Sequence, residues 1–179
     1  MTNHLPVRVW ASDESRFGLH TICRRRLTSR GVKPIGIHQH RFENTWAFGA
    51  VEPTSGASHW MEFPTLNVAM MQRFVDDFGR TYSASCNLVL VDNASSHTAK
   101  TLVLPPNVVL VFQPPYSPEV NPCERVWQAI KARLAWDVSP TLAVLRQRLV
   151  EIFRSYSAGQ IQSLTSYPYF VAAVNAVSP

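Results

Sequence analysis

Two short apolar runs, Leu88–Val91 and Val108–Phe112, place the strongest constraint on how this chain can fold. Neither run alternates apolar with polar residues, and such continuous runs are typical of strands buried on both faces of a parallel sheet. Six of the thirteen prolines lie between Pro105 and Pro122, so rigid loops flank the second run. We therefore expect both runs to be central, parallel strands of a sheet that helices cover on both faces.

Two hairpins are expected before the first of these runs. Val7–Ala11 has apolar residues at alternate positions and predicts a short strand, with Phe17–Ile22 as its partner. Thr45–Val51 and Ser58–Phe63 predict a second hairpin, whose connecting turn ends at Gly56, a residue type that adopts positive φ without strain. The sheet is therefore expected to combine antiparallel and parallel strands.

Helical periodicity and capping residues predict three longer helices. One covers Leu66–Tyr82, the second starts at an N-cap provided by Asn121, and the third spans Thr141–Tyr156. Hairpins followed by alternating strands and helices predict the α/β class, with a mixed five-stranded sheet flanked by helices. We expect one domain over residues 1–157 and a C-terminal tail with weak signals over residues 158–179.

Composition excludes several classes of protein. A hydrophobic fraction of 46% with 16% charged residues excludes a disordered chain. No apolar run approaches the roughly 20 residues of a membrane span, and the N-terminus lacks the apolar core of a signal peptide. The three cysteines are odd in number and have no metal-binding spacing, which predicts reduced thiols in a cytosolic setting.

The positive charge of the chain is concentrated near its N-terminus. The net charge is +5, and the first 50 residues hold eight basic against three acidic side chains, so the whole excess lies there. Such an excess favours a polyanionic partner without proving one. The densest basic stretch would contact DNA phosphates or form a solvated loop. It contains Arg24, Arg25, Arg26, Arg30 and Lys33.

Three carboxylates occupy positions that a core does not require. Asp13 and Asp92 each follow a predicted strand, and Glu124 lies in the first turn of a predicted helix. Neighbouring carboxylates repel one another unless a cation lies between them, and Mg²⁺ is the natural cation for oxygen ligands. Taken singly, each residue is better explained as a turn or capping residue. Taken together, they predict a metal site at the carboxyl ends of the strands.

Three segments contain these carboxylates: VWASDES, LVLVDNASSHTA and VFQPPYSPEVNPCERVWQAIK. They resemble the DDE transposases of the mariner superfamily, in particular its bacterial insertion-sequence branch, and the resemblance runs from about Val7 to Ala135. It implies a ribonuclease-H-like fold. It also implies that Asp13, Asp92 and Glu124 are the catalytic residues and the ligands of two Mg²⁺ ions, for which Mn²⁺ can substitute.

The activity that this resemblance implies is metal-dependent cleavage of transposon ends, followed by 3′-OH strand transfer into target DNA. It further implies a homodimer in the bacterial cytoplasm, associated with the nucleoid. Only twelve residues precede Asp13, where relatives carry helix-turn-helix modules, so we expect a separate upstream module to recognise DNA. Two alternatives stay open: a ribonuclease-H-like nuclease without joining activity, and an inactive remnant that binds DNA or a partner.

Three further residues are candidates for supporting roles. His97 would contact the scissile phosphate or a metal ligand, or would lie on the surface. Asn93 would orient the preceding aspartate or form a plain turn. Tyr116, in the proline-rich loop, would contact DNA or pack against the sheet. Glu14 should face away from Asp13 on an extended strand, so we do not count it as a metal ligand.

Overall fold

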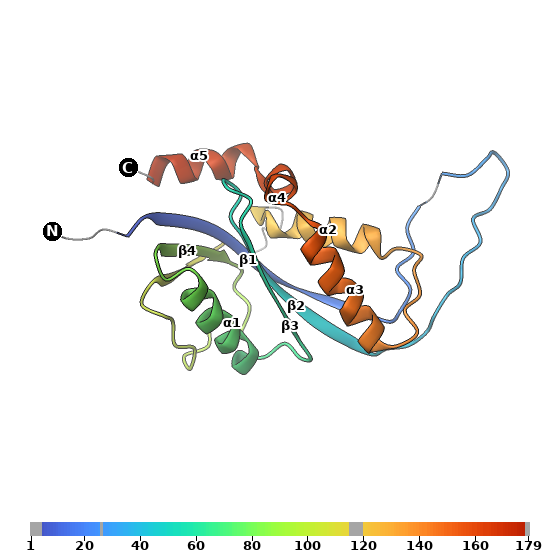
Figure 1. Ribbon diagram of the computed structural model, residues 1–179, viewed down its shortest axis with the longest axis horizontal. Helices are drawn as coiled ribbons and strands as arrows, with labels where there is room; N and C mark the ends of the chain where they lie inside the picture. The colour runs from blue at the N-terminus through green and yellow to red at the C-terminus, as the bar shows by residue number, and fades with distance from the viewer. Residues whose placement is uncertain (1–4, 26, 115–119, 178–179) are drawn as a thin grey trace.

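One mixed sheet of five strands lies at the centre of the molecule (Figure 1). The computed structural model describes residues 5–25, 27–114 and 120–177. The strands are β1 (Val7–Gly18), β2 (Asn44–Val51), β3 (Ser58–Phe63), β4 (Cys86–Val91) and β5 (Val108–Phe112). Their order is β3-β2-β1-β4-β5, with β1, β4 and β5 parallel and β2 antiparallel to both of its neighbours. The predicted mixed five-stranded α/β sheet is confirmed.

The first strand is longer than predicted. β1 continues without a break through Asp13, and residues Ala11 to Gly18 pair with β2. The expected hairpin between Val7–Ala11 and Phe17–Ile22 is therefore wrong, because Phe17 pairs with Thr45 of β2. Asp13 consequently lies within a strand, opposite Gly49, and not at a strand end.

The two apolar runs do form adjacent parallel strands, but only β4 is an inner strand. β5 is at the edge of the sheet, and Val109, Val111 and Phe112 each expose between 43% and 45% of their surface. The expectation of two central strands therefore holds for β4 and fails for β5. The central strand is β1, which has two strands on each side.

Helices cover both faces of the sheet (Figure 1). α1 (Val68–Thr81) packs its buried residues Met71, Phe74 and Phe78 with Trp10 of β1 in one core cluster. The other face packs against a second cluster, to which four helices contribute. These helices are α2 (Cys123–Arg133), α3 (Leu142–Ser155), α4 (Ala158–Thr165) and α5 (Pro168–Val177). Alternation along β1 explains the two clusters, because Trp10 joins the first and Ala11 joins the second.

The C-terminal segment is part of this packing. Ser157 starts α4 with a capping box to Gln160, and Ile161 is buried in the second core cluster. Phe170 and Val174 of α5 join the same cluster. Residues 158–177 therefore form two packed helices, where the sequence predicts only a tail. None of the described helices is both long and apolar enough to cross a membrane.

The β2–β3 turn contains a position that only glycine fits. Gly56 has a φ of +74°, as the sequence predicts for this turn. Its amide donates to the carbonyl oxygen of Glu52 at 2.8 Å. A Cβ at this position would also collide with the carbonyl oxygen of Ala158. The turn is therefore packed directly against the N-terminus of α4.

The connection between β1 and β2 projects from the body of the molecule (Figure 1). Its two arms are joined near their base, where the amide of Leu19 donates to the carbonyl oxygen of Glu43 at 3.0 Å. One arm is also attached to the segment after α2, because Trp136 donates from its backbone amide to Ile22 and from Nε1 to the carbonyl oxygen of Arg24. The base of the projection is thus fixed to the domain.

Candidate active site

The sheet register brings the two aspartates to neighbouring positions. Ala11 of β1 pairs with Leu90 of the parallel strand β4. Two residues further along, the chains carry Asp13 and Asp92. Because adjacent parallel strands keep the same register, these two carboxylates lie side by side on neighbouring strands. The sequence places the aspartates correctly relative to each other, although β1 continues beyond this point.

The third carboxylate reaches the same place through α2. Trp127, one turn after Glu124, donates from Nε1 to Oδ2 of Asp13 at 2.9 Å. The Trp127 ring can come this close to β1 only because β2 has a glycine here. A Cβ at Gly49 would collide with the rings of Trp60 and Trp127. Gly49 pairs with Asp13, so the glycine opposite the aspartate makes room for the indole that holds it.

Asn121 attaches the start of α2 to β1. Its Nδ2 donates to the carbonyl oxygen of Ser12 at 2.9 Å, and its Oδ1 accepts from the amide of Cys123 at 3.0 Å. The expected N-cap role is replaced by this link, because α2 begins at Cys123 with Pro122 at the N-cap position. The buried Asn121 therefore fixes the distance between the first turn of α2 and Asp13.

The electrostatics of the site call for a cation. Burial, followed by the charges of Glu124, Glu14 and Asp92, raises the pKa of Asp13 from 3.8 to about 8. Among the described residues, no lysine or arginine forms an ion pair with Asp13, Asp92 or Glu124. A divalent cation would remove the repulsion that raises this pKa.

The donor set of the site fits Mg²⁺ or Mn²⁺. All three groups offer carboxylate oxygens, which these hard cations prefer. The three carboxylates therefore fit these ions as ligands.

His97 joins Asp92 to Glu14. His97 donates from Nδ1 to Oδ1 of Asp92 at 2.8 Å, and its Nε2 lies 2.9 Å from Oε1 of Glu14. Burial lowers the pKa of His97, but the hydrogen bonds and charges of Glu14 and Asp92 outweigh this effect and raise it to about 9. The imidazole is therefore protonated at neutral pH and donates from both nitrogens.

This arrangement changes the expected roles of His97 and Glu14. The side chain of His97 is fully buried, so the structure places it behind Asp92 and not at a surface where it would contact a DNA phosphate. Glu14 faces away from Asp13, as alternation predicts, but it has a definite partner in His97. The sequence analysis missed this link, because residues 83 positions apart give no local signal of contact.

The remaining candidates are distributed over the surface around the site. The side-chain amide of Asn93 donates from Nδ2 to the carbonyl oxygen of Gln113 at 2.8 Å and so connects the end of β4 to the end of β5. Arg25, Arg30 and Lys33 are exposed on the projecting connection. The predicted DNA contacts of Arg26 and Tyr116 lie outside the described residues.

A basic groove of about 510 Å³ lies where the β1–β2 connection leaves the sheet. Its lining includes Arg16, Arg24, Arg41 and Lys131. Lys131 lies within electrostatic range of Glu124 and Asp13, whose charges oppose the lowering of its pKa by burial. Of these four residues, the sequence analysis singled out only Arg24. The spacing of seven residues between Glu124 and Lys131, two turns along one helix face, is the signal that could have found the lysine.

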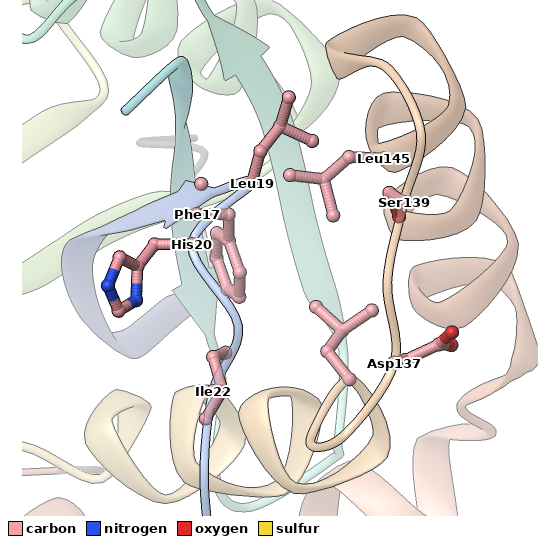
Figure 2. A pocket seen from close by; sticks show the side chains of 9 residues that line it. Phe17, Leu19, His20, Ile22, Asp137, Ser139 and Leu145 are labelled. Atoms are coloured by element: carbon pink, nitrogen blue, oxygen red, sulfur yellow. The ribbon is translucent and has the colours of Figure 1, made fainter. Parts of the chain in front are cut away.

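A second cavity is too small to be a substrate site. It has a volume of about 20 Å³ and lies between the end of β1 and the start of α3, where Leu19 and Leu145 line it (Figure 2). This volume admits about one water molecule, and none of the three carboxylates lines the cavity. The carboxylates therefore form the candidate active site, and Lys131, which interacts electrostatically with Glu124 and Asp13, links the basic groove to them.

Comparison of the sequence with known families finds a match over most of the chain. Residues 8–141 match the family described as "DDE superfamily endonuclease". A curated relative, the uncharacterized protein y4pE/y4sA of Sinorhizobium fredii (strain NBRC 101917 / NGR234), is 38% identical over 89 residues. The matched region covers 48% of this chain and 66% of the relative.

Solved structures show the same fold. The mariner Mos1 paired-end complex with Mn matches with a TM-score of 0.70 and 18% identity, over 88% of this chain and 51% of that chain. The Mos1 paired-end complex with left transposon end matches with a TM-score of 0.67 and 20% identity, over 88% and 51% of the two chains. The predicted ribonuclease-H-like fold of a transposase catalytic domain is thus confirmed.

The chain spans about half the length of these Mos1 chains. The family match includes Asp13, Asp92 and Glu124 and the strands and helix that carry them. It covers well over half of the sequence. The chain belongs to the DDE superfamily of endonucleases.

Proposed function

We propose that this chain is the catalytic domain of a DNA transposase, which cleaves transposon ends and transfers their 3′-OH strands into target DNA. The observation that carries the proposal is the convergence of Asp13, Asp92 and Glu124 from β1, the end of β4 and the first turn of α2. The Mos1 structures with the same fold are described as paired-end and strand-transfer complexes. The proposal extends that activity to this chain.

Two Mg²⁺ ions, or Mn²⁺ in their place, would be held by these carboxylates, with Asp13 shared and Asp92 and Glu124 each completing one site. When bound, such ions activate a water or 3′-OH nucleophile and stabilise the leaving oxygen of a phosphodiester. Mos1 complexes have been crystallised with Mn and with Mg. The protein itself contributes position: Trp127 holds Oδ2 of Asp13, and His97 and the amide of Ala94 hold Oδ1 of Asp92.

DNA would approach along the basic groove. Arg16, Arg24 and Lys131 line this groove, and Lys131 interacts electrostatically with Glu124 and Asp13. Phosphate contacts by such residues position a duplex without reading its sequence. The exposed Arg25 and Arg30 lie on the projecting connection that begins at the same groove. We propose that this basic surface holds the scissile strand against the carboxylates.

Assembly and cellular setting follow from the same proposal. Pairing of two transposon ends requires two catalytic domains, so we propose a homodimer. The Mos1 chains are about twice as long as this one, and we propose that a helix-turn-helix module outside the sequence described recognises the ends. The relative from Sinorhizobium fredii supports a bacterial origin, and we propose that the protein acts on DNA in the cytoplasm.

The test separates cleavage from joining. Purified protein is incubated with supercoiled plasmid and a labelled oligonucleotide bearing a free 3′-OH, with Mg²⁺, with Mn²⁺ or with chelator. We expect metal-dependent nicking of the plasmid and transfer of the label into it. Nicking without label transfer would replace the proposal by a nuclease that does not join.

A matched pair of variants tests whether Asp92 is a catalytic residue. Asp92→Asn should abolish both reactions and leave the melting temperature at or above that of the wild type. Glu151→Gln, an exposed acid on α3, should change neither reaction. Wild-type nicking by the Asp92→Asn variant would overturn the site, and binding of DNA without any reaction by the wild type would favour the inactive remnant.

A further inference from the structure

Three histidines gather on the projecting connection, away from the carboxylates. Among the described residues, His20, His38 and His40 form the one group of three histidine, cysteine or acidic side chains whose ligand atoms all lie within 4.8 Å of one another. The ring centroids of His38 and His40 are 4.2 Å apart, and that of His20 lies 5.1 Å and 5.4 Å from them. All three are exposed.

We propose that His20, His38 and His40 form a binding site for Zn²⁺, which pins the two arms of the β1–β2 connection to each other. The site uses no carboxylate of the active site, so it stands or falls independently of the proposed function.

The backbone register builds this cluster. The amide of Thr21 donates to the carbonyl oxygen of Gln39 at 3.3 Å, and the amide of Gln39 donates to Oγ1 of Thr21 at 2.8 Å. His38 and His40 flank Gln39, and side chains two apart on an extended segment point to the same side. His20 precedes Thr21 on the opposing arm. The ring of His20 meets those of His38 and His40 edge to face.

The ligand chemistry selects a transition metal. Neutral imidazole is a common ligand of Zn²⁺, whereas Mg²⁺ prefers oxygen. Desolvation and the neighbouring charges of His40 and His20 lower the pKa of His38, so the ring offers a free lone pair at neutral pH. Tetrahedral Zn²⁺ with bonds of 2.0–2.1 Å separates its nitrogens by roughly 3.4 Å. Small side-chain rotations therefore close the cluster around an ion, and water completes the fourth position.

The consequence of binding is order in the connection. Large apolar side chains of both arms are exposed, including Leu27 at 104%, Ile35 at 93% and Phe42 at 81%. These residues bury little surface, so few tertiary contacts hold the arms beyond their base. A metal that bridges residues 20, 38 and 40 adds a link with covalent character at that point. The groove of Arg16, Arg24 and Lys131, which His20 also lines, would be fixed by the same link.

The experiment measures zinc directly. Purified protein is dialysed against Zn²⁺ in excess Mg²⁺, which occupies carboxylates but not imidazoles, and bound zinc is counted per chain. Replacement by Co²⁺ then reports geometry through the strong visible absorption of a tetrahedral site. We expect one zinc per chain and a tetrahedral cobalt spectrum, and we expect His20→Ala, His38→Ala and His40→Ala each to weaken binding by more than about tenfold.

A carboxylate variant is the matched control. Asp13→Asn combined with Glu124→Gln should keep the zinc and the cobalt spectrum, because neither residue belongs to the cluster. Loss of zinc in this variant, or full zinc binding by His38→Ala, would overturn the proposal. The three histidines are exposed, so equal melting temperatures of the metal-free proteins will show that their replacement leaves the fold intact.

A second readout tests the pinning of the arms. Hydrogen exchange at the amides of Thr21 and Gln39 should slow when Zn²⁺ is added to the wild type and should be unchanged in His38→Ala. Zinc bound at full stoichiometry without any slowing would overturn the structural role.

Discussion

At the scale of single residues, the active site depends on a partner that no sequence pattern reveals. Glu14 lies in β1 and Asp92 directly after β4, and the two meet through the buried ring of His97. The three carboxylates can be proposed from the sequence because each lies in a characteristic segment. The sequence could not predict the Glu14–His97 contact, because that contact depends on the parallel register of β1 and β4 and on the turn after β4.

Replacement of His97 tests this contact. His97→Ala leaves the carboxylate of Glu14, whose side chain is only 5% exposed, without a partner. Removal of one member of a buried charged pair is costly, so we expect the free energy of unfolding to fall by about 3 kcal/mol. We also expect at least a tenfold loss of nicking, since Asp92 loses its orientation.

The control for that loss is a double variant. Glu14→Gln with His97→Ala removes both charges and should recover part of the stability but not the nicking activity. Denaturant unfolding and plasmid nicking measure the two effects separately. Equal stability of the single and double variants would contradict the charge argument.

Asp13 makes the stability of the metal-free protein depend on pH. Its pKa is 3.8 in the unfolded chain and about 8 in the folded one, so the folded state binds this proton more tightly. The free energy of unfolding that this tighter proton binding contributes is fully present below about pH 4 and is lost as the pH rises through 8. Asp13→Asn removes this loss, so the melting temperature of the variant should exceed that of the wild type by an amount that grows over this range.

Bound metal should reverse the pH dependence of the melting temperature in the wild type but not in Asp13→Asn. Added Mn²⁺ is expected to raise the melting temperature of the wild type most strongly near pH 8, because the carboxylate is then free to bind it. Thermal unfolding with chelator and with Mn²⁺ checks both statements. A constant difference between the two proteins from pH 4 to 8 would contradict the assignment.

At the scale of elements, the strands and helices with strong local signals were predictable. Asn67 and Thr141 are the N-caps of α1 and α3, and their side chains accept hydrogen bonds from backbone amides of the first turn. The break expected at Asp13 is absent because the pairing of β1 with β2 outweighs the low strand propensity of an aspartate. α5 was missed because its burial depends on a surface formed by distant elements.

Gly56 shows how an element boundary can be fixed by a single residue. Gly56→Ala introduces a Cβ at a positive φ and against the carbonyl oxygen of Ala158. We expect a loss of about 2 kcal/mol in the free energy of unfolding. The control is Gly159→Ala. A Cβ at this position meets nothing within 4 Å, so the change should be neutral or slightly stabilising in α4.

Denaturant unfolding of the two glycine variants gives the comparison. The collision and the positive φ act only on the first of them. Equal stabilities for both variants would show that the β2–β3 turn can move away from α4, contrary to the packing described.

At the scale of the whole molecule, the sheet separates two kinds of surface. The exposed Arg80 lies on α1, which packs on one face, while Lys131 of α2, on the other face, lines the basic groove. The net charge of the sequence could not locate this groove, because Arg16, Arg41 and Lys131 come from separate segments. Only the folded chain brings them together.

DNA binding should follow this division. Lys131→Ala is expected to weaken binding to duplexes of any sequence and to lower the slope of log affinity against log salt by about 1. Arg80→Ala should leave both quantities unchanged. Titrations of labelled DNA at several salt concentrations provide the measurement, and equal slopes for the two variants would place the DNA path elsewhere.

The position of Asp13 inside β1 has a consequence for engineering. A residue in the middle of a paired strand has little freedom to shift, whereas Asp92 lies at the start of a loop and Glu124 at the start of a helix. Variants with altered metal preference are therefore best sought by changing the turn after β4 and the segment before α2, with the β1 sequence left intact. Libraries built on this division would keep one ligand as a constant reference and vary the reach of the other two.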